Sequence, residues 1–90
     1  MNKSELVAAI ADKADISKAK AELALTTLTD TISYQLQKGE AVTLVGFGTF
    51  SVKEREARQG RNPQSGESIL IPARRVPGFK AGANLKDAVN

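Results

Sequence analysis

The sequence contains no cysteine and no histidine. Without cysteine the chain can form neither a disulfide nor a thiolate metal site, and without histidine the usual zinc ligand sets are absent too. A catalyst would have to rely on lysine, serine or carboxylates, and no convergent set of these residues stands out. We therefore expect a protein that is not an enzyme and that has no metal and no cofactor.

Large apolar side chains are also scarce. The chain has three phenylalanines, one tyrosine, one methionine and no tryptophan among 90 residues, and much of its 41% hydrophobic content is alanine. Ninety residues suffice for a single domain, 1–90, but alanine contributes little burial to a core. Because disulfides and zinc are excluded, pairing with a second subunit is the remaining source of stability, so we expect a dimer.

No apolar run approaches the length that spans a membrane, and the N-terminus acquires a carboxylate at Glu5. This pattern is not that of a signal peptide, so we expect a cytoplasmic protein with no membrane partner.

Charge is distributed unevenly along the chain. Residues 1–40 hold five lysines and six carboxylates, net −1, whereas residues 41–90 hold eight lysines and arginines and four carboxylates, net +4. All five arginines lie in the second half. Arginine suits bidentate phosphate contact and narrow grooves, so nucleic acid is the expected partner.

The first 39 residues predict two helices. Asn2 and Glu5 have the spacing of a capping box, and Leu6, Val7, Ile10 and Ala14 follow at helical spacing. Ser17 is a suitable N-cap for a second helix, which would end at Lys38 and Gly39. Its apolar stripe comprises Ala21, Leu25, Leu28, Ile32 and Leu36. Leu23 and Tyr34 lie off this stripe, which predicts burial on more than one side.

After Gly39 the apolar period changes to that of strands. Residues 40–52 predict strands around a Gly46-Phe47-Gly48 turn, with Phe47, Phe50 and Val52 in the core. Residues 74–82 return to this sheet, and Pro72 and Pro77 are expected at edge or irregular positions. Residues 83–90 predict a short helix with Leu85 and Val89 facing inward.

Residues 53–73 predict a long hairpin with its tip near Arg61–Gly66. Strand alternation places Lys53, Arg55, Ala57, Gln59 and Arg61 on one face and Arg58 on the other. Between residues 53 and 68 the only aliphatic groups are Ala57 and the Pro63 ring, so the hairpin has little to bury and is expected to project.

These motifs resemble the histone-like bacterial DNA-binding family, which includes HU and integration host factor, and within it the HU-beta type. The resemblance rests on Gly46-Phe47-Gly48-Thr49-Phe50, the tip Gly60–Gly66 with Arg61-Asn62-Pro63, and the run Pro77–Gly82. It implies an α+β fold: a helical hairpin base (1–39), a three-stranded antiparallel sheet (40–52 and 74–82), a protruding β-ribbon arm (53–73) and a C-terminal helix (83–90). It also implies an intertwined dimer, either a homodimer or a heterodimer with a paralogue.

The implied function is architectural binding of double-stranded DNA with little sequence specificity. The arms would follow the minor groove, Pro63 would wedge between base pairs and bend the duplex, and the protein would compact the bacterial nucleoid. The implied DNA-binding residues are Lys3, Lys53, Arg55, Arg58, Arg61, Asn62, Pro63, Arg74, Arg75, Lys80 and Lys86. Lys18 and Lys20 are weaker candidates, and Lys13 and Lys38 are expected to be solvated surface charges.

Two positions depart from the family pattern. Ala83 and Glu67 stand where relatives often carry a basic residue, which puts affinity and bend angle in doubt but leaves the tip intact. Two alternatives stay open: a sequence-preferring bender of the integration-host-factor kind, and an RNA-binding or ribosome-associated protein. The chain lacks an aromatic stacking platform for RNA.

Overall fold

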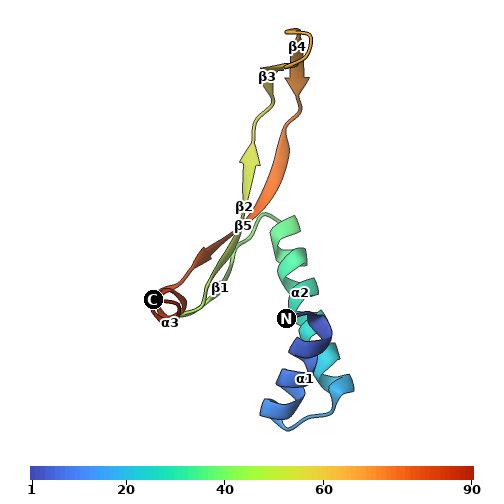
Figure 1. Ribbon diagram of the computed structural model, residues 1–90, viewed down its shortest axis with the longest axis vertical. Coiled ribbons are helices and arrows are strands. Elements are labelled where there is room, and N and C mark those ends of the chain that lie inside the picture. The colour runs from blue at the N-terminus through green and yellow to red at the C-terminus, as the bar shows by residue number, and fades with distance from the viewer. The chain divides into compact units, whose positions relative to one another are not determined.

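A computed structural model describes all residues, 1–90, and contains three helices and five strands (Figure 1). The elements are α1 (Lys3–Ala14), α2 (Lys18–Gln37), β1 (Val42–Leu44), β2 (Gly48–Arg55), β3 (Arg58–Arg61), β4 (Ser68–Ile71), β5 (Arg74–Ala81) and α3 (Ala83–Ala88). The chain divides into two compact units, Met1–Tyr34 and Gln35–Asn90. None of the helices is both long enough and apolar enough to cross a bilayer.

The first unit is a helical hairpin with a very small core. The Asn2 side chain accepts a hydrogen bond of 2.9 Å from the Glu5 amide and caps α1, as predicted. Only Val7, Ala11 and Ala21 are buried, with Ile10, Ile16 and Leu25 packed against them. Of the four apolar residues at helical spacing in α1, Val7 is buried and Ile10 packs against it, whereas Leu6 and Ala14 are exposed.

Helix α2 begins and ends where the sequence predicts. The Ser17 hydroxyl accepts a bond of 3.1 Å from the Lys20 amide, and Gly39 adopts a left-handed φ of 81° after the last turn. Leu23 is 67% and Tyr34 58% exposed, so the burial predicted on more than one side of the helix is not seen at these two residues.

The body of the second unit is an antiparallel sheet in the order β1-β2-β5. Phe50 pairs with Phe79 across β2 and β5, and their ring centroids lie 4.8 Å apart. Phe47 joins this cluster at 5.6 Å from Phe79. The expectation of a phenylalanine core is met in part: the rings pack together, but Phe47 remains 47% and Phe79 45% exposed.

Beyond the body, β3 and β4 form a two-stranded ribbon that continues from β2 and β5 (Figure 1). Arg55 pairs with Arg74, and the ladder resumes with Arg58 opposite Ile71, so two residues on each strand are unpaired and the register is unchanged. The sequence predicted a long hairpin with an edge or irregular position at Pro72, and the ladder is interrupted at residues 56–57 and 72–73, next to this proline.

Proline explains the interruption. Successive N–H positions along a strand point alternately toward and away from the neighbouring strand. Pro77 lies inside edge strand β5, where its nitrogen can point away from β2. Pro72 is five positions earlier, an odd number, so its nitrogen points toward the partner strand and lacks the hydrogen that the ladder needs.

Helix α3 packs beside the turn between β1 and β2. The Gly82 amide donates to the Phe47 carbonyl at 2.7 Å and the Leu85 amide to the Gly46 carbonyl at 3.3 Å. Leu85 is partly buried, as predicted. Val89 is 75% exposed, so its predicted inward position was wrong: the helix ends at Ala88, before Val89.

Candidate nucleic-acid interface

The strand register sorts the charged residues of the ribbon onto two faces. Residues directly opposite each other in a ladder share a face, and alternate residues along a strand do too. One face therefore carries Thr49, Ser51, Lys53 and Arg55 from β2, Gln59 and Arg61 from β3, Ser68 and Leu70 from β4, and Arg74, Val76, Gly78 and Lys80 from β5. We call this set the basic face. It contains five lysines and arginines and no carboxylate.

The opposite face has a different character. On the sheet body it carries Phe50 and Phe79, with Glu54 and Arg75 at the end next to the ribbon, and on the ribbon it carries Arg58. Acidic and basic side chains are mixed there, so its field is weaker than that of the basic face. The sequence-based division, with Arg58 alone on the far side from Arg55 and Arg61, agrees with this register.

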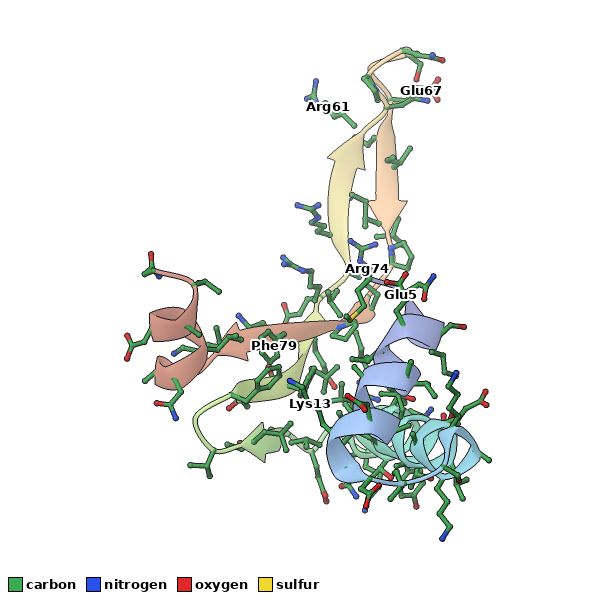
Figure 2. The ribbon with its side chains drawn as sticks, turned by 60° about the horizontal axis from the view of Figure 1, so that its bottom comes forward. Glu5, Lys13, Arg61, Glu67, Arg74 and Phe79 are labelled. Carbon is green, nitrogen blue, oxygen red and sulfur yellow. The ribbon has the colours of Figure 1, made fainter.

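The cations of the basic face are available to a ligand. Its five basic side chains are exposed, and none of them makes a hydrogen bond or an ion pair within the chain. The side chains of Arg58 and Lys86 are likewise exposed and unbonded. Figure 2 shows Arg61 at the far end of the ribbon and Arg74 near its base. Exposed, unpaired arginines along a narrow ribbon suit contact with a polyanion.

The tip between β3 and β4 is organised by Asn62. Its amide donates to the Glu67 carbonyl at 2.8 Å, its carbonyl accepts from Gly66 at 2.7 Å, and its Oδ1 accepts from the Gln64 amide at 3.0 Å. Gly66 has a left-handed φ of 73°, which allows the chain to turn back. Pro63 is exposed and takes part in none of these bonds, so its ring is presented by a turn that does not depend on it.

Two features of the basic face were missed by the sequence analysis. The hydroxyls of Thr43 and Thr49 lie 3.3 Å apart, and Thr49 pairs with Lys80, so a polar row crosses all three strands of the body. Leu70 is 72% exposed among the ribbon cations. The polar row could have been predicted by continuing the strand alternation from Lys53 back to Thr49. The position of Leu70 on the same face follows only from its pairing with Gln59 in the ladder.

The remaining predicted cations lie elsewhere. Lys3 donates to the Thr26 hydroxyl at 3.4 Å, and it shares with Lys18 an open groove of about 460 Å³ in the helical unit. Lys20 does not line this groove. Lys86 belongs to α3, of which Ala83 is the first residue, and Glu67 lies at the ribbon tip (Figure 2). Arg75 alone among the arginines is engaged, with its guanidinium bonded to backbone carbonyls of α2.

A helical hairpin joined to a sheet whose basic face continues onto a projecting ribbon defines a class of small nucleic-acid-binding proteins. The chain belongs to the bacterial DNA-binding protein family, whose sequence pattern matches residues 1–90. It is 60% identical to DNA-binding protein HU-beta of Pseudomonas aeruginosa and 58% identical to HU-beta of Escherichia coli, in each case over 100% of both chains. The resemblance to the HU-beta type is thereby confirmed.

Solved structures agree with the fold. A cocrystal structure of Anabaena HU with DNA matches with a TM-score of 0.89 and 49% identity, over 99% of this chain and 97% of that one. HU from Thermotoga maritima matches with a TM-score of 0.73 and 37% identity over the whole of both chains. The α+β class, the sheet and the ribbon expected from the sequence are confirmed by these likenesses.

Proposed function

We propose that this protein is a histone-like architectural protein that binds double-stranded DNA with little regard to sequence and bends it. The observation that carries the proposal is the basic face, which continues from the sheet body onto the ribbon and holds no carboxylate. Membership of the bacterial DNA-binding protein family and the likeness to a DNA-bound HU support it.

The residues assigned to DNA fall into three groups. Lys53, Arg55, Arg61, Arg74 and Lys80 of the basic face would meet phosphates or the groove, and Arg58 would contact the flank of the same groove. Lys3 and Lys86 would hold the flanking duplex. Side chains that seek phosphate position a protein without reading bases, which accounts for the expected lack of sequence preference.

The tip would supply the bending. Asn62 holds the turn, and Pro63 presents an apolar ring with no hydrogen-bonding demand of its own. Inserting such a ring between base pairs costs a few kcal/mol of unstacking, which contacts on the bent duplex offset. Two wedges, one from each of two subunits, would kink one duplex twice.

A second subunit is part of the proposal because the chain leaves too much apolar surface uncovered. Its buried core consists of Val7, Ala11 and Ala21, while Leu23, Tyr34 and Phe47 are each about half exposed or more. A second copy or a close paralogue would present the same kind of surface and could cover these side chains. Such a dimer acting on chromosomal DNA would be located in the bacterial nucleoid.

End-to-end FRET on a random-sequence duplex tests this function. Titration with the protein at low and moderate salt should raise the transfer efficiency to a plateau, and raising the salt should weaken binding as counterions are retained. Binding detected by anisotropy without a change in transfer would refute bending. A strong preference for one selected sequence, or for structured RNA over duplex DNA, would instead favour one of the two alternatives left open by the sequence.

A further inference from the structure

Arg75 differs from every other arginine in the chain because its guanidinium is already bonded. Its Nη1 donates to the Gln37 carbonyl at 2.9 Å and its Nη2 to the Leu36 carbonyl at 3.0 Å. Glu54 lies directly across the ladder from Arg75, yet no ion pair joins the two side chains. The guanidinium therefore donates its hydrogen bonds to helix carbonyls and not to the carboxylate across the ladder.

The acceptors are the final carbonyls of α2. The last carbonyls of a helix have no partner within it, and they carry the negative end of the helix dipole. The Leu36 carbonyl already accepts from the Gly39 amide at 3.0 Å, and Arg75 adds a second donor to it and a donor to Gln37. The planar guanidinium has several N–H donors in a fixed geometry and can donate to two adjacent carbonyls at once, which a lysine ammonium does less well.

Gly39 lies beside this guanidinium, and its role there is conformational. A Cβ placed at Gly39 would lie 3.5 Å from Nη2 of Arg75, in ordinary contact, whereas the φ of 81° disfavours most other residues. The turn that ends α2 therefore depends on Gly39, and Arg75 is bonded to the carbonyls just before it.

We infer that Arg75 is a positioning residue, which fastens the base of the ribbon to the last turn of α2 and makes no contact with phosphate. It lies on the opposite face from Arg74, its neighbour in β5, and each of its terminal nitrogens donates to a carbonyl of α2. Both arginines are DNA contacts in the prediction from the sequence, whereas the geometry assigns that role to Arg74 and a mechanical role to Arg75. This inference rests on the proposed function, because the orientation that Arg75 fixes is that of a DNA-bending ribbon.

Four proteins separate the two roles: the wild type, Arg75→Ala, Arg75→Lys and the matched control Arg74→Ala. Each is compared by thermal unfolding without DNA, by the salt dependence of binding to a random duplex, and by the FRET plateau at saturation. The FRET is recorded at a temperature at which circular dichroism shows every variant to be folded.

For Arg75→Ala we expect a Tm lower by about 4–8 °C, as loss of a helix-end interaction in a small domain would give. Its slope of log K against log salt should equal that of the wild type, and its FRET plateau should be lower because the ribbons are no longer held at the bending angle. Arg75→Lys keeps the charge and should recover only part of the Tm and of the plateau. Arg74→Ala should keep the Tm and lose roughly 0.9 of slope for each subunit that contacts DNA.

A slope for Arg75→Ala that falls as far as that of Arg74→Ala would show phosphate contact and overturn the inference. A wild-type plateau in the folded Arg75→Ala protein would reduce Arg75 to a stabilising residue and overturn it as well. A wild-type protein that leaves the duplex straight would overturn the proposed function itself, which is a distinct result.

Discussion

The ring of Pro63 offers the sharpest test of bending, because the tip turn can be expected to survive its replacement. The hydrogen bonds of the turn join Asn62, Gln64, Gly66 and Glu67, and proline contributes no N–H to lose. Pro63→Ala therefore removes the wedge while the backbone that presents it stays in place. A change in DNA shape can then be attributed to the ring.

The size of the effect follows from the atoms removed. Proline to alanine deletes two methylenes, each worth about 0.8 kcal/mol when fully buried, so one wedge loses at most about 1.6 kcal/mol of contact. That corresponds to roughly tenfold in affinity for each wedge. The mutant also escapes the unstacking cost of a few kcal/mol, so the net loss of affinity should be smaller than this.

Bending should respond more strongly than binding. In end-to-end FRET, Pro63→Ala should bring the saturated plateau most of the way back to that of free DNA, while anisotropy reports a dissociation constant raised by less than tenfold per wedge. Gln64→Ala, one residue further along the exposed tip, is the control and should bend DNA as the wild type does. A wild-type plateau with Pro63→Ala would refute the wedge.

Three further outcomes are expected. Leu70→Thr should weaken DNA binding severalfold and leave the salt slope unchanged, because a 72% exposed leucine on the basic face offers DNA an apolar, uncharged contact; an altered slope would contradict this. Gly48→Ala should destabilise the protein by about 1–3 kcal/mol in urea unfolding, because the added methyl would overlap the Phe79 ring and lie 2.6 Å from the Lys80 carbonyl oxygen. Asn2→Ala should cost about 1 kcal/mol in the same assay through loss of the α1 cap, and Asn2→Asp, which keeps an acceptor, should cost little.

Local signals made the helices predictable from the sequence. Asn2 and Ser17 accept the amide bonds that their side chains suit, and Gly39 turns the chain out of α2. Each of these features depends on residues within four positions of one another, so the pattern of a single segment contains the information. The turn signals around Pro63 are local in the same sense.

The features that escaped prediction depend on contacts distant in sequence. The hydrogen bonds of Arg75 join positions 38 and 39 residues apart, and no pattern around Arg75 distinguishes it from Arg74. The exposure of Phe47 has another cause: the sequence marks it as a core residue, yet its side chain stays 47% exposed. Apolar patterning identifies a side chain that should be buried, without saying which molecule buries it.

The strand register connects the packing of the body with the charge of the ribbon. Because successive side chains point to opposite faces, a slip of one residue between β2 and β5 would move one strand's cations to the face that carries the phenylalanines. Pairing of Phe50 with Phe79, and the close fit of Gly48 beneath the Phe79 ring, oppose such a slip. The same register continues past the interruption to Arg58 and Arg61, so aromatic packing in the body determines where the arginines of the ribbon point. A core residue such as Phe50 is in this sense a determinant of the DNA-binding surface, although it lies on the opposite side of the sheet from that surface.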